Sequence, residues 1–143
     1  MGKSRLHPGP LPAHGPDEPV SPAHGGEVTF CGRVRAHHRG RAVSAIVYHA
    51  QRPLAEARLC AIETEAAERF GVVCRVAHAI GRLTVGEISV AVQIRGGHRA
   101  ECFAACRWAI DTIKSSVPIW KEEHYADGSI EFQDGTPLRE VAD

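Results

Sequence analysis

The sequence lacks a net charge, an apolar run long enough for a membrane span and a Cys-x-x-Cys pair. It has 17 Lys plus Arg and 17 Asp plus Glu, so no charge excess favours nucleic acid or an anionic membrane as a partner. No apolar run approaches the roughly 20 residues of a membrane span. Lys3 and Arg5 are not followed by the apolar stretch of a secretory signal. These absences predict a cytoplasmic protein.

The cysteines show no pattern that indicates a disulfide scaffold or a metal site. Their number is odd, and reduced, partly buried thiols are typical of such a set in a cytosolic protein. A catalytic thiol stays open as an alternative. His7, His14 and His24 are widely spaced and have no cysteine partners, so we expect no metal. The five cysteines are Cys31, Cys60, Cys74, Cys102 and Cys106.

The chain divides into a short tail and one domain. Residues 1–25 are rich in Pro, Gly and His and have no hydrophobic period, which predicts a mobile N-terminal tail. Residues 26–143 are long enough for a single globular domain with its own core.

Hydrophobic periodicity predicts an α+β fold in which two main helices cover one mostly antiparallel sheet. Period-2 or β-branched segments favour strands at 27–35, 42–49, 72–80 and 87–95. Gly81 and Gly86 are expected to bracket a turn. Helical spacing follows Pro53 up to Gly71, and again follows Gly97. Asp127-Gly128 indicates a small C-terminal β hairpin.

Two lysines flank a proline near the end of the second helix. Pro118 has no backbone donor and disfavours the α region at Val117, so the helix that carries Lys114 should stop there. Lys121 should then lie on the extended segment beyond, and the two ammonium groups can converge. A lysine held near other cations or in a dry pocket has a lowered pKa and can act as an acid, base or nucleophile. The alternative is a pair of ordinary surface charges.

Two further basic segments could bind anions. Gly96-Gly97-His98-Arg99 starts a helix, where free N–H groups and the helix dipole attract phosphate or carboxylate; it could also be a turn whose His98 and Arg99 only face solvent. Arg33 and Arg35 share one strand face, which is either a pocket wall or a solvent face. The loop 36–41 could form a lip over a pocket or contact RNA, although the aromatics that accompany RNA-binding patches are missing.

Several of these segments together resemble the large, catalytic subunit of molybdopterin synthase. The matching segments are 28–35, 97–101, 107–111 and 117–121, together with Lys114, and they follow the family's order and spacing over about residues 26–132. The resemblance implies an α/β hammerhead-type sandwich, a homodimer and a heterotetramer with a small ubiquitin-like sulfur carrier. The carrier's C-terminal Gly-Gly thiocarboxylate would supply sulfur to cyclic pyranopterin monophosphate, forming the molybdopterin dithiolene. Residues 26–143 would then be a catalytic domain that needs no cofactor or metal.

The resemblance also implies roles for individual residues. Lys114 and Lys121 match the essential, catalytic lysines of the family. The positions that match its substrate-binding pocket, in addition to both lysines, are Arg33, Val34, Arg35, His98, Arg99, Glu122 and Glu123.

The sequence departs from the family at three places. A Pro-rich stretch replaces an N-terminal strand and helix, and Tyr48-His49-Ala50-Gln51 stands where an acidic and an aromatic residue are common. Arg95-Gly96-Gly97 replaces a more usual turn of small residues with proline. The rival functions are a non-catalytic module that binds a phosphorylated ligand or a Gly-Gly-ended carrier, and a thiol-dependent sulfurtransferase.

Overall fold

The computed structural model describes residues 4–13 and 21–134, which form a single sheet with two helices. The sheet order is β2-β6-β5-β4-β7-β8, with β1 beside β5 and β3 beside β4. The helices are α1 (Arg52–Phe70) and α2 (Arg99–Ser116). The strands are β1 (Leu6–Pro8), β2 (Gly26–Arg33), β3 (His37–His38), β4 (Arg41–Ala50), β5 (Val73–Thr84), β6 (Ile88–Gly96), β7 (Ile119–Tyr125) and β8 (Ile130–Asp134).

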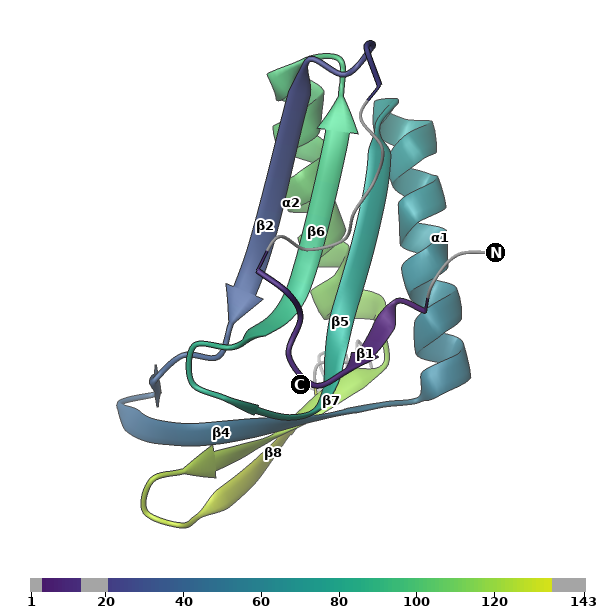
Figure 1. Ribbon diagram of the computed structural model, residues 1–143. Helices are drawn as coiled ribbons and strands as arrows, with labels where there is room; N and C mark the ends of the chain where they lie inside the picture. The colour runs from purple at the N-terminus through teal and green to yellow at the C-terminus, as the bar shows by residue number, and fades with distance from the viewer. Residues whose placement is uncertain (1–3, 14–20, 135–143) are drawn as a thin grey trace.

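Strand β5 is shared by two arms of the sheet. Its first half, Val73 to His78, pairs antiparallel with β6, whereas Gly81 to Thr84 pair antiparallel with β4. Figure 1 shows the consequence: β2, β6 and β5 run together, and β4, β7 and β8 cross their lower end. The predicted turn between Gly81 and Gly86 is wrong at its start, because the strand continues through Gly81 to Thr84. Gly81 has φ +92, a conformation that glycine adopts without strain, so it serves the change of partner within the strand.

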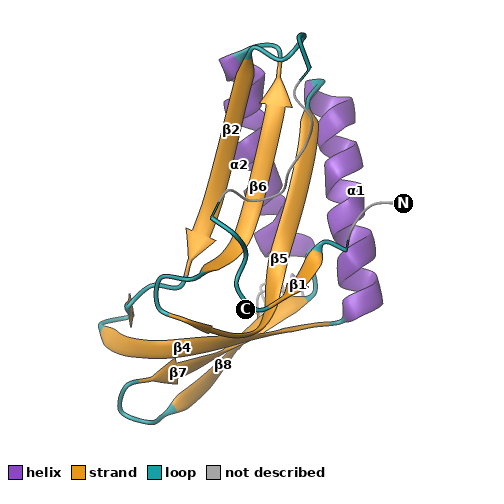
Figure 2. Ribbon diagram, in the orientation of Figure 1, coloured by secondary structure: helices purple, strands orange, loops and turns teal. Residues whose placement is uncertain are grey.

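Both helices cover one face of the arm formed by β2, β6 and β5 (Figure 2). Helix α1 has Pro53 in its first turn and ends at Gly71, whose left-handed φ of +66 closes the last turn. Leu59 and Ile62 of this helix and Ile94 of β6 have no exposed surface. The predicted α+β sandwich with a mostly antiparallel sheet, two helices and a C-terminal hairpin is confirmed.

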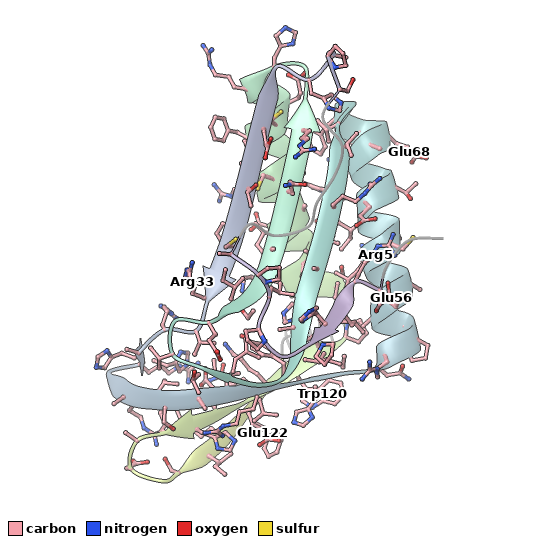
Figure 3. All side chains as sticks on the ribbon, in the orientation of Figure 1. Arg5, Arg33, Glu56, Glu68, Trp120 and Glu122 are labelled. Carbon is pink, nitrogen blue, oxygen red and sulfur yellow. The ribbon has the colours of Figure 1, made fainter. Side chains whose placement is uncertain are left out.

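The N-terminal prediction does not hold for residues 4–11. Leu6–Pro8 form β1, which pairs parallel with β5 at residues His78 to Ile80, and Leu6 is only 5% exposed. Arg5 reaches helix α1, where its guanidinium lies 3.2 Å from Glu56 and 2.8 Å from Glu63 (Figure 3). The composition of residues 1–25 concealed these anchors, because isolated apolar and charged residues in a Pro- and Gly-rich stretch produce no hydrophobic period. Residues 1–3 and 14–20 lie outside the described part of the chain.

Over residues 4–13 and 21–134, neither helix is long and apolar enough to cross a membrane.

Candidate functional site

The proline places the two lysines on different elements, as the sequence predicts. Helix α2 ends at Ser116, and Val117 is already extended, with φ −87 and ψ 130. Lys114 therefore lies in the last helical turn, and Lys121 lies on β7. Both side chains line the same cavity of about 260 Å³.

This cavity lies where α2 ends against the junction of the two sheet arms. Tyr48 faces it from β4 directly opposite Lys121 in the strand register, His78 from β5, and Trp120 from β7. Its full lining is Tyr48, His78, Ser89, Val90, Ile113, Lys114, Val117, Ile119, Trp120, Lys121 and Gln133.

A second cavity of about 120 Å³ adjoins the first and brings in the strand arginines. Lys114 and Lys121 line both spaces, so the two cavities form one continuous site. Arg33, at the end of β2 (Figure 3), and Arg35 line the second space. Arg33 Nη1 also donates a hydrogen bond of 2.7 Å to the carbonyl of Gly86, which holds its guanidinium group. The result is a site with four cationic side chains, suited to an anionic ligand.

The surroundings of Lys114 perturb its ionisation. Lys114 is exposed as a residue, yet partial desolvation lowers its pKa, and the charges of Lys121 and Arg35 add to this effect. No carboxylate lies within salt-bridge distance of Lys114 among the described residues. A lowered pKa brings a lysine closer to the range in which it can release or accept a proton.

Lys121, in contrast, has a buried counter-ion. Its Nζ lies 3.4 Å from Glu123, which is 1% exposed. The Glu123 carboxylate also accepts hydrogen bonds of 2.8 Å from Tyr125 Oη and from Gln133 Nε2. Burial and this hydrogen bond raise the pKa of Tyr125 to about 12, which keeps the phenol as a donor. Glu123 thus lines the second cavity and anchors Lys121.

Glu122 occupies the other face of β7. Successive side chains of a strand alternate, and the Glu122 carboxylate is bound by His49 at 2.6 Å and His124 at 3.1 Å rather than by cavity residues. These contacts lower the pKa of Glu122. His49 also stacks on Trp120, with 5.9 Å between the ring centroids. Glu122 lines neither cavity.

Three other predicted residues line neither of these two cavities. Val34 is 3% exposed and packs in the core with Val43 and Ile46. His98 and Arg99 start α2 and are exposed, and at about 1.5 Å rise per residue they lie roughly 22 Å along the helix from Lys114. The backbone N–H of His98 donates a hydrogen bond of 3.2 Å to the carboxylate of Glu101. A carboxylate of the chain itself therefore occupies part of the anion site expected at this helix start.

The sequence did not indicate Tyr48, His78 or Ser89 as site residues. Tyr48 and Ser89 line both cavities, and His78 lines the larger one. His78 interrupts the apolar face that Val76 and Ile80 form on β5, and a polar residue at such a position is the one signal that could have indicated it.

The described residues form no metal-binding cluster, and three of the five cysteines are buried. No group of three His, Cys, Asp or Glu side chains could hold a metal ion within the described ranges. All five cysteines are free, as predicted. Burial raises the pKa of the thiols of Cys102 and Cys106 and raises that of Cys74 to about 12, so these three are poor nucleophiles.

Relatives of this chain from different organisms carry the same name. The chain is 46% identical over 109 residues to a molybdopterin synthase catalytic subunit from Nostoc, covering 75% of this chain and 66% of the relative. It is 40% identical to the subunit of the same name from Pyrococcus abyssi, covering 73% of this chain and 71% of that one. The chain thus spans about two thirds of the length of these relatives.

Solved structures show the same fold. The molybdopterin synthase crystal structure from Staphylococcus aureus superposes with a TM-score of 0.83 at 29% identity, covering 93% of this chain and 98% of the other. A Helicobacter pylori structure described as a complex of subunits 1 and 2 of molybdopterin-converting factor superposes with a TM-score of 0.69 at 19% identity, covering 86% and 85% of the two chains. It supports the fold alone. The family model described as MoaE protein matches residues 13–116, a range that includes Lys114 and stops before Lys121. The chain belongs to the MoaE family.

Proposed function

We propose that this protein is the catalytic subunit of molybdopterin synthase, a sulfurtransferase of molybdenum cofactor biosynthesis that acts in the cytoplasm. It would transfer sulfur from the C-terminal thiocarboxylate of a small carrier subunit to cyclic pyranopterin monophosphate, forming the molybdopterin dithiolene. The observation that carries the proposal is the cavity in which Lys114 and Lys121 meet beside Arg33 and Arg35. The names of its relatives from Nostoc and Pyrococcus abyssi agree with it.

The charges of the site suit this chemistry. The phosphate of the precursor and the carboxyl terminus of the carrier are both anionic, and the cationic side chains can neutralise them and the oxyanion that develops during transfer. The thiocarboxylate sulfur is itself the nucleophile, so the chain needs none of its own. Lys114, whose pKa is lowered and which lacks a carboxylate partner among the described residues, is suited to donate a proton to a departing oxygen. Lys121, anchored by Glu123, is suited to hold a bound anion.

The position of His98 and Arg99 favours a homodimer with composite sites. The family resemblance implies that both contact substrate, yet within one chain they lie about 22 Å along α2 from Lys114. They can serve a lysine cavity only if it belongs to a second copy. We therefore propose a homodimer in which each chain contributes its helix start to the other's pocket, with one carrier bound to each chain.

The test replaces each lysine and measures product. Lys114→Ala and Lys121→Ala should each lower dithiolene formation at least about 100-fold, the usual size of a lost general acid or positioning cation. Purified variants are assayed with thiocarboxylated carrier and precursor. Arg107→Ala is the matched control, since Arg107 lies on the same helix, is 85% exposed and pairs with the exposed Asp111. Full activity of both lysine variants would refute the proposal; carrier binding without product in the unmodified protein would favour the non-catalytic binding module.

A further inference from the structure

His78 is a buried imidazole that the lysine chemistry does not use. It is 8% exposed, lies on β5 between Val76 and Ile80 of the same strand face, and lines the larger cavity. The Tyr48 ring packs edge-on against it, with 5.0 Å between centroids and an interplanar angle of 73°. These neighbours hold the ring in one place.

The backbone determines which nitrogen of this ring carries the proton. His78 Nδ1 lies 2.7 Å from the carbonyl oxygen of Ala79. A carbonyl oxygen can only accept, so Nδ1 must be the protonated donor. In a neutral ring the other nitrogen, Nε2, then has a free lone pair. Among residues 4–13 and 21–134, Nε2 has no hydrogen-bond partner.

The buried position of the His78 ring beside two lysines keeps it neutral. Burial, together with the nearby charges of Lys114 and Lys121, lowers the pKa of His78 to about 4. Near neutral pH, Nε2 is therefore a fixed acceptor in a cavity lined by the cationic donors Lys114 and Lys121 and by the neutral side chains of Tyr48, Ser89 and Gln133. The one carboxylate of the site, Glu123, is already engaged by Tyr125, Gln133 and Lys121.

A ligand that carries only anionic groups would leave this acceptor unpaired. A pterin ring, in contrast, has N–H groups that need acceptors, and a donor or acceptor that loses its water on binding and stays unpaired costs affinity. We propose that His78 is a specificity-determining residue whose Nε2 accepts a hydrogen bond from an N–H of the substrate's pterin ring, while the lysines and arginines hold its anionic groups. This inference rests on the proposed function.

Two substitutions distinguish the role of Nε2 from that of Nδ1. In His78→Gln the side-chain amide can reach the position of Nε2 and present an acceptor to the cavity. In His78→Asn the shorter amide can replace only Nδ1, so it keeps the bond to Ala79 and removes the cavity acceptor. Precursor affinity is measured by calorimetry on the full chain without carrier, and KM and kcat with thiocarboxylated carrier. Thermal unfolding of both variants checks that they fold.

We expect His78→Asn to weaken precursor binding about 10- to 100-fold through KM, and His78→Gln to stay within about threefold of the unmodified protein. Equal binding by both variants, or an equal loss in both, would overturn the role of His78 and leave the proposed function standing. If the unmodified protein fails to bind precursor, the proposed function fails as well.

A spectroscopic measurement covers the case in which His78→Asn does not fold. In ¹⁵N NMR of the unmodified protein, His78 Nε2 should show the shift of an unprotonated ring nitrogen, and this signal should move when precursor is added. A protonated Nε2, or a signal that precursor leaves unmoved, would overturn the inference.

Discussion

The contact between Arg5 and helix α1 predicts that the N-terminal segment stabilises the fold, and Arg5→Ala tests this. Arg5 Nη2 lies 2.8 Å from Glu63 Oε1, and the other oxygen of Glu63 accepts the backbone N–H of Val76 at 2.9 Å. Glu63 is 7% exposed, so the substitution would leave an almost buried carboxylate without its cation. Arg5 also binds Glu56, which is more exposed.

The expected loss follows from these exposures. Breaking a fully buried ion pair costs about 3–5 kcal/mol, mainly because one charge remains unpaired. The side chain of Arg5 is 22% exposed, so water can reach the site and the loss should lie near the lower limit, at about 3 kcal/mol. The contact with Glu56 adds at most about 1 kcal/mol. With a urea dependence of about 2 kcal/mol per molar, the unfolding midpoint should fall by about 1.5 M.

Urea unfolding at fixed protein concentration, followed by circular dichroism, measures the effect. Arg107→Ala is the control, because its exposed pair with Asp111 should contribute less than about 0.5 kcal/mol. The double variant Arg5→Ala/Glu63→Gln removes the buried charge as well, so it should lose about 2 kcal/mol less than the sum of the single losses. An Arg5→Ala midpoint equal to that of the unmodified protein, or strictly additive losses in the free energy of unfolding, would refute this reasoning. The prediction of a mobile N-terminal tail would then stand.

Two further predictions concern the lysines and the dimer. The chain has only three lysines, Lys3, Lys114 and Lys121, so the pKa of Lys114 can be followed by ¹³C NMR of labelled lysine, assigned with Lys114→Arg. Removing the nearby positive charge in Lys121→Met should raise the pKa of Lys114, and an unchanged or lower pKa would contradict the repulsion. Composite sites predict that co-refolding an inactive Lys114→Ala/Lys121→Ala chain with an inactive His98→Ala/Arg99→Ala chain restores about a quarter of full activity, since half of random dimers are mixed and each has one intact pocket. No recovery would contradict composite sites.

Local chemistry made most of the elements predictable. Pro53 and Gly71 delimit α1, and Pro118 ends α2 and separates the two lysines, because these residues restrict or free their own backbone dihedrals. The alternation along 87–95 similarly identifies β6, although the structure buries every residue of that strand. The N-terminal strand β1 was missed because its stability comes from distant partners on β5 and α1.

The sequence by itself determined the elements, the separation of Lys114 from Lys121 and, through several motifs together, the family. Only the tertiary structure decided which charged side chains meet. A one-residue step along β7 places Glu123 beneath Lys121 and Glu122 on the opposite face, and the length of α2 separates His98 and Arg99 from the lysines of their own chain. His78 enters the site only because β5 and the end of α2 line the same cavity. Such contacts depend on the register and crossing of strands distant in the chain, which no local pattern records.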